Sequence, residues 1–224
     1  MAYEQLDKNT VAASGQLGDT ELVRFYNLAG TGKRILLVGN SITLHGEAPQ
    51  IGWNGEWGMA ASCREKDYAH RLMAAFPDSA FCICQVAAWE ADYPRGSRYL
   101  KDFSPAREFT PQVIVCRFLE NCPKKEMDPA VLRKSIVELL QFLDPEGQAQ
   151  CLFTSSFWQH PGDPIMQELS REQNAPWVYL GDLGQDPAMR ADGLFDHKGV
   201  AHHPGDLGMA VIAERIQAAL ETLL

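Results

Sequence analysis

Serine, asparagine and histidine side chains stand where a strand is expected to end or a helix to begin. Ser41 follows the apolar run 34–38, Asn121 follows the run 112–117, and three histidines, His197, His202 and His203, come just before the last helical pattern. A serine hydroxyl becomes a nucleophile when a base removes its proton, and histidine is a suitable base. An asparagine amide can stabilise the oxyanion of acyl transfer. Taken singly, however, each residue is more often a turn or cap residue.

Apolar runs alternating with helical patterns predict the scaffold for these groups. The runs read as buried parallel strands, and the helical patterns between them imply βαβ units with helices on both faces of a mainly parallel sheet. Ligands bind at the carboxyl ends of such strands, so the chemistry is expected there. The expected strands are 34–38, 81–87, 112–117, 150–155 and 177–180, and the expected helices are 59–76, 129–143, 163–173 and 206–223.

Residues 1–32 differ from the rest of the chain, being polar and broken by glycines. We predict that they form an N-terminal extension packed on the domain, with one short strand or helix near 20–28. Residues 33–224 are predicted to form a single domain, since the size suits one core and no repeat or second domain is visible.

Composition excludes several classes of protein. The chain has 224 residues with 20 basic and 29 acidic side chains, and its net charge of −9 argues against a nucleic-acid partner. Its longest aliphatic run, 35–38, is far short of a membrane span. The N-terminus lacks the pattern of a signal peptide, so a cytoplasmic location is expected unless a leader has been trimmed. The six cysteines lack zinc spacing and are expected to be reduced core thiols; no metal or other cofactor is predicted.

Three short motifs resemble those of the SGNH (GDSL-type) hydrolases. Residues 39–43 (Gly-Asn-Ser-Ile-Thr) are similar to the first block of that family, with asparagine where many members have aspartate. Residues 119–121 (Leu-Glu-Asn) resemble the asparagine block, and 203–209 (His-Pro-Gly-Asp-Leu-Gly-Met) resemble the C-terminal histidine block. The resemblance spans about 34–220 and implies a flavodoxin-like, three-layer α/β/α sandwich with about five strands. It also implies ester hydrolysis, often deacetylation of sugars.

By position, the resemblance implies that Ser41 is the nucleophile, Asn121 an oxyanion donor and His203 the base. The family usually has an aspartate three residues before the histidine, but here that residue is Val200. A backbone carbonyl could orient His203 instead, giving a Ser-His dyad, which we favour. A carboxylate elsewhere is the alternative, and the candidates are Asp196, Glu120 and Glu90.

The family's glycine block, which supplies a second oxyanion N–H, also has no counterpart. Residues 86–90 (Val-Ala-Ala-Trp-Glu) contain no glycine at the expected turn. The N–H of Ala87 or Ala88 could take that role, and the N–H of Ser41 is a further candidate.

A long loop after the serine is expected to line the cleft. His45 lies near Ser41, and Trp53 and Trp57 could stack on a sugar ring, although ordinary packing under a long loop is an equally good explanation. Glu90 and Glu120 follow strands at the same edge and are predicted to contact the substrate, although Glu90 could instead pair with Arg117. As a glycosidase pair they would leave the serine and histidine motifs unexplained.

These features predict a serine esterase acting on a small acyl ester, most simply an O-acetyl group on a carbohydrate. The missing aspartate and glycine leave open a non-catalytic carbohydrate-binding protein on a degenerate hydrolase fold. Acyl transfer to another acceptor is the third alternative.

Overall fold

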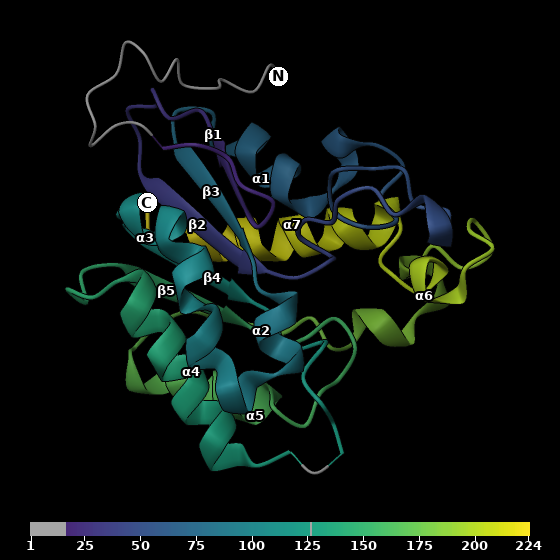
Figure 1. Ribbon diagram of the computed structural model, residues 1–224. Helices are drawn as coiled ribbons and strands as arrows, with labels where there is room; N and C mark the ends of the chain where they lie inside the picture. Colours follow the sequence, from purple (N-terminus) through teal and green to yellow (C-terminus); the bar gives the residue numbers. More distant parts are fainter. Residues whose placement is uncertain (1–16, 126) are drawn as a thin grey trace.

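The computed structural model describes residues 17–125 and 127–224 (Figure 1). The strands are β1 (Val23–Tyr26), β2 (Arg34–Gly39), β3 (Ala80–Gln85), β4 (Val113–Arg117), β5 (Gln150–Thr154) and β6 (Trp177–Val178). The helices are α1 (Tyr68–Ala75), α2 (Ala87–Ala91), α3 (Ser104–Glu108), α4 (Pro129–Leu143), α5 (Asp163–Glu172), α6 (Lys198–Ala201) and α7 (Asp206–Leu220).

The six strands form one sheet in the order β1-β3-β2-β4-β5-β6. Every neighbouring pair is parallel except β1 and β3, which are antiparallel. The mainly parallel sheet is therefore confirmed, with one strand more than the five expected. That strand, β1, lies in the segment 20–28, where a short strand or helix was expected; residues 1–16 of the same extension lie outside the described residues.

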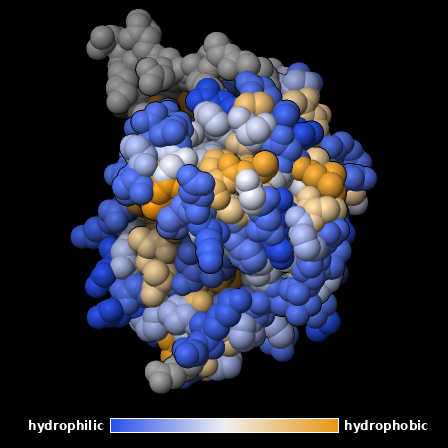
Figure 2. Space-filling view, turned by 90° about the vertical axis from the view of Figure 1, so that its right-hand side faces the viewer, coloured by the Kyte–Doolittle hydropathy of each residue, from blue (hydrophilic) through white to orange (hydrophobic). Residues whose placement is uncertain are grey.

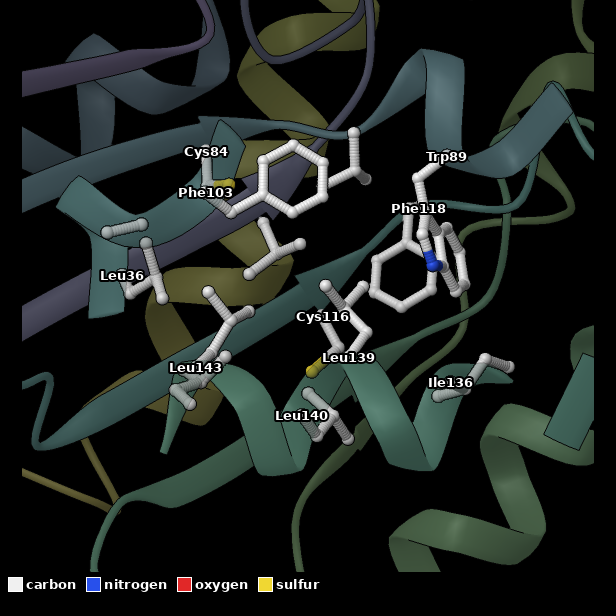
Figure 3. Packing of buried hydrophobic residues seen from close by; sticks show 14 of the residues in the cluster. Leu36, Cys84, Trp89, Phe103, Cys116, Phe118, Ile136, Leu139, Leu140 and Leu143 are labelled. Carbon is white, nitrogen blue, oxygen red and sulfur yellow. The ribbon is translucent and has the colours of Figure 1, made fainter. Parts of the chain in front are cut away.

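Helices cover both faces of this sheet, as the alternating side chains of each strand require. In β2, Leu36 and Val38 point to one core, while Ile35 and Leu37 point to the other. Helix α4 contributes to the first core, and Figure 3 shows its leucines turned toward the strands. Helices α1 and α7 pack together over the second core. The three-layer α/β/α fold predicted from the sequence is thus confirmed.

The predicted helices agree with the structure except near residue 59. Helix α4 matches its predicted range, and α5 and α7 differ only at their C-terminal ends. Helix α1, however, begins at Tyr68 instead of residue 59, because Asp67 caps it by accepting a hydrogen bond from the His70 N–H. The structure also adds α2, α3 and a 3₁₀ helix at Tyr93–Phe103 between β3 and β4, where no helix was predicted.

The topology places a crevice at the end of β2. The chain leaves β2 through α1 on one face of the sheet and leaves the adjacent β4 through α4 on the other. Open α/β sheets bind ligands at such a switch point, outside the carboxyl ends of the strands. Within the described residues, no helix has the length and apolar character needed to cross a membrane.

Candidate active site

A serine and a histidine far apart in the sequence meet at this crevice. Ser41 follows β2, and its Oγ lies 2.8 Å from Nε2 of His203. His203 is held between α6 and α7, the two helices of the C-terminal segment. The loops of this segment lie toward the right of Figure 1, and Figure 2 views that side of the molecule. The separation is that of a hydrogen bond, so the two side chains predicted to act together are in contact.

A backbone carbonyl orients the histidine ring. Nδ1 of His203 lies 2.7 Å from the carbonyl oxygen of Gly199 in α6. Since a carbonyl only accepts hydrogen bonds, Nδ1 carries the proton and Nε2 is left to accept the Ser41 hydroxyl. This is the arrangement of a Ser-His dyad, and neither Asp196, Glu120 nor Glu90 hydrogen-bonds the ring among the described residues.

Burial keeps His203 neutral. It lowers the pKa of the imidazole to about 4, with only partial compensation from the Gly199 carbonyl and from the negative charge of Glu120. The charges of His45 and Arg117 lower it further. At neutral pH the ring is therefore an unprotonated base that can accept the serine proton.

A buried polar cluster lies beneath the serine, formed by Asn40, Glu90, Arg117 and Glu120. Asn40, Glu90 and Arg117 are fully buried, and the side chain of Glu120 is 4% exposed. The Asn40 amide donates to both carboxylates, at 3.0 Å to Glu90 and 2.6 Å to Glu120. Arg117 donates to Asn40 at 3.2 Å and forms an ion pair with Glu120. The cluster ties β2, α2 and β4 together below the candidate nucleophile.

The single cation of the cluster is shared unequally between its two carboxylates. Burial, the largest single effect, opposes the charge of Glu120, but the charge of Arg117 and the hydrogen bonds from the Phe157 N–H and the Asn40 amide together outweigh it and lower the pKa of Glu120. Burial and the nearby charge of Glu120 raise the pKa of Glu90 to about 7. Glu120 is therefore the ionised partner of Arg117, and Glu90 is the carboxyl that changes its charge near neutral pH.

Asn121 reaches the site through Glu90. Its Nδ2 donates to Oε2 of Glu90 at 2.6 Å, and the residue is otherwise exposed. An amide nitrogen carries two protons, so the second is available to an oxyanion. The backbone N–H of Ser41 makes no hydrogen bond to any residue the structure describes, which also leaves it available. The N–H of Ala87, one of the two predicted substitutes for the missing glycine, is instead donated to the Gln85 side chain at 3.1 Å.

Three residues predicted to contact the substrate are buried instead. Glu90 and Glu120 point inward, because Arg117 and several amide donors satisfy their oxygens there. Trp53 is 3% exposed and packs under its loop against Trp57 and Phe195, with ring centroids 5.6 and 6.1 Å away. The expectation of direct sugar contacts for these three side chains is wrong.

His45 and Trp57 remain accessible beside the pair. Both are half-buried, and the backbone N–H of His45 donates to the Trp57 carbonyl at 3.0 Å, which ties the two ends of the long loop. The Trp57 indole donates to the carbonyl of Ala61, so its N–H is already used. Their predicted contact with substrate stays a prediction.

Trp158, which was not predicted from the sequence, forms a wall of the site. Its ring stacks on His202, with centroids 5.3 Å apart and planes 2° from parallel, and meets His203 edge-on at 5.6 Å. Trp158 lies in the loop after β5, at the same edge of the sheet as Ser41. Its position after a predicted strand was the signal available, since that edge was expected to carry the chemistry.

Comparison with known proteins identifies the fold. No protein-family model matches the sequence, and no curated protein matches it significantly. Solved structures do match. An acetyl xylan esterase, AlAXEase, has a TM-score of 0.54 at 15% identity, with 84% of this chain and 99% of that chain covered. A putative lipolytic protein of the G-D-S-L family from Desulfitobacterium hafniense DCB-2 has a TM-score of 0.52 at 11% identity, covering 84% and 99%.

A two-domain esterase (CEX) active on acetylated mannans is similar as well, with a TM-score of 0.55 at 16% identity. The match covers 87% of this chain, which spans about half (51%) of that larger protein. At these identities the likeness concerns the fold: the chain has the α/β/α fold of the SGNH hydrolases, as its motifs led us to expect.

Proposed function

We propose that this protein is a serine esterase that hydrolyses a small acyl ester with a Ser41–His203 dyad. The observation that carries the proposal is the 2.8 Å contact between Ser41 Oγ and His203 Nε2, with Nδ1 of the same ring held by the Gly199 carbonyl. A serine, a base in hydrogen-bond reach and a group that orients the base are the parts that nucleophilic catalysis requires.

The reaction proceeds through an acyl-enzyme. His203 Nε2 takes the Ser41 proton as Oγ attacks the acyl carbonyl, and the Ser41 N–H and the Asn121 amide hold the oxyanion. The protonated ring then gives its proton to the departing alcohol. Water attacks the acyl-enzyme with His203 again as base, releasing the acid and restoring Ser41.

The alcohol is most simply a carbohydrate carrying an O-acetyl group. The acetyl xylan esterase and the mannan-active esterase, which share the fold, support this choice.

Substitution of the serine tests the nucleophile. We expect Ser41→Ala to abolish hydrolysis of 4-nitrophenyl acetate and labelling by a fluorophosphonate probe, because both need an activated hydroxyl. Ser62→Ala is the matched control: Ser62 lies on the exposed loop before α1 and bonds Asp206, so it should retain both signals. Full turnover by Ser41→Ala would refute the assignment.

The same assays separate the two alternatives. A binding protein on a degenerate hydrolase fold would leave the wild type unlabelled by the probe. An acyltransferase would be labelled, but added sugar would divert the acetyl group from water to the sugar, which product analysis detects.

A further inference from the structure

Glu90 is fully buried next to the candidate site, yet the proposed reaction gives it no task. Its carboxylate accepts three hydrogen bonds from two parts of the chain, the residue after β2 and the turn after β4. Oε1 accepts from the Asn40 amide at 3.0 Å and from the Leu119 backbone N–H, and Oε2 accepts from the Asn121 amide at 2.6 Å. One carboxylate therefore joins the residue before the nucleophile to the residue predicted to stabilise the oxyanion.

The turn that carries Asn121 has a conformation that needs such support. Leu119 has φ of 121°, a strained backbone region that residues with a side chain rarely adopt. Its N–H is the one that Glu90 accepts, so the carboxylate stabilises the strained residue directly. Without that bond, we expect the turn to relax toward a more common backbone conformation and to displace Asn121.

Packing fixes Glu90 relative to this turn. The preceding residue in α2, Trp89, meets Phe118 edge-on, with ring centroids 5.6 Å apart and planes at 87°. Figure 3 shows the two rings together in the first core. Both are buried, at 1% and 0% exposure, so α2 is packed firmly against the residue that follows β4.

We propose that Glu90 is a positioning residue: it clamps the strained Leu119–Asn121 turn to the Asn40–Ser41 segment and so aims the Asn121 amide at the reacting carbonyl oxygen. This inference rests on the proposed esterase function. Glu90 itself touches no substrate, since it is buried, and it acts through the amide of Asn121.

The clamp depends on the ionised form of Glu90. A carboxylate accepts from all three donors, whereas a protonated carboxyl carries a proton on one oxygen, which then accepts more weakly and itself needs an acceptor that none of the three donors provides. The groups that influence this proton are Glu120, Arg117 and Cys122, which lie on β4 or the loop after it. Burial raises the pKa of Glu90 to about 7, so wild-type kcat should rise with pH near neutrality as the clamp forms.

Glu90→Gln tests the clamp with little change in shape. The glutamine can keep an oxygen toward Asn40 and Leu119, which leaves its NH₂ facing the Asn121 amide. Asn121 must then turn its own oxygen toward that NH₂ and withdraw its N–H from the site. We expect kcat for 4-nitrophenyl acetate to fall on the order of 100-fold with KM nearly unchanged, as for loss of one oxyanion donor.

A double-mutant cycle identifies the route of the effect. If Glu90 acts through Asn121, Glu90→Gln should cost little in an Asn121→Ala background, and the double variant should match Asn121→Ala alone. Losses that multiply would overturn the proposal. Ser135→Ala is the control for general destabilisation, because it removes a buried hydrogen bond to the Tyr93 carbonyl away from the site; its kcat should stay at the wild-type value.

A second measurement stands independently of turnover. The side-chain amide resonance of Asn121, identified by its absence in Asn121→Ala, should shift in Glu90→Gln and should titrate near neutral pH in the wild type only. An unchanged resonance would overturn the clamp even if hydrolysis is observed. A wild type without esterase activity would refute the proposed function, while the resonance still decides whether Glu90 holds Asn121.

Discussion

The ring of His203 is oriented without the carboxylate that usually accompanies a catalytic histidine. A carboxylate fixes the ring and stabilises the imidazolium that forms during reaction, whereas the Gly199 carbonyl fixes the ring with only a partial charge. Because burial lowers its pKa, the imidazole is a weak base that is neutral at pH 7. This arrangement favours esters, whose alcohol leaving groups need less assistance from a protonated ring than amines do.

The pH dependence of acylation follows from this weak base. Burial lowers the pKa of His203 to about 4, and only the neutral ring accepts the serine proton. In Glu90→Gln, where the second group no longer titrates, we expect kcat/KM for 4-nitrophenyl acetate to increase with pH through a midpoint of about 4 and then level off. A midpoint near the ordinary histidine value of about 6.5 would contradict this reading.

Strand β1 makes part of the predicted N-terminal extension an integral element of the sheet. Its residues pair with β3 from Val23 opposite Cys84 to Tyr26 opposite Phe81. Val23 and Phe25 enter the first core, where the Phe25 ring lies 5.9 Å from that of Phe109. We therefore expect β1 to stabilise the folded state as the other strands of the core do.

Truncation of one side chain in β1 tests this contribution. We expect Phe25→Ala to lower the free energy of unfolding by about 3–5 kcal/mol, as for other buried aromatic residues, because Phe25 is only 3% exposed. Urea denaturation measures the change, and Glu21→Ala, at an exposed position just before the strand, should have little effect. A loss below about 1 kcal/mol would mean that β1 detaches without disturbing the core.

Some elements were predictable because their local pattern and their burial agree. The run 34–38 is apolar throughout and becomes β2, and the stripe in 129–143 becomes α4. The 3₁₀ helix at Tyr93–Phe103 was missed because Pro94 and Gly96 obscure any helical period. Gly96 is instead required by packing, since a Cβ there would lie 2.4 Å from the Trp89 indole nitrogen.

The candidate site, too, could be predicted from the sequence only in part. Ser41 and a histidine of the last loop could be paired from sequence because one follows a strand and the other precedes the last helix, and the resemblance to the SGNH motifs singled out His203. The direction of Glu90 and Glu120 could not, because an edge carboxylate faces inward only if partners such as Arg117 and Asn40 meet it there. Those partners come from strands whose side chains read as ordinary core positions in the sequence.

At the scale of the whole molecule, two buried groups oppose each other in the pH dependence of stability. His203 has a folded-state pKa of about 4, below its unfolded value, so its contribution to stability decreases as pH falls from about 6.5 to 4. Glu90 has a folded-state pKa of about 7, above its unfolded value, so its contribution decreases as pH rises from about 4.5 to 7. Between pH 4.5 and 6.5 the two slopes have opposite signs.

If one of the two groups is removed, the pH dependence of unfolding should reveal the contribution of the other. Glu90→Gln abolishes the term that falls with pH, so the urea midpoint of this variant should rise more steeply than that of the wild type between about pH 4.5 and 6.5. His203→Gln abolishes the contribution that increases with pH. Relative to the wild type, the urea midpoint of this variant should therefore fall as pH rises over the same range. The half-buried Asp92 and the exposed Asp182 have lowered pKa values, so they titrate below this window and leave the comparison intact. Parallel midpoint curves for the wild type and Glu90→Gln would show that Glu90 has the same pKa in the folded protein as in the unfolded chain. The cluster of Asn40, Glu90, Arg117 and Glu120 would then stabilise two negative charges as well as water does.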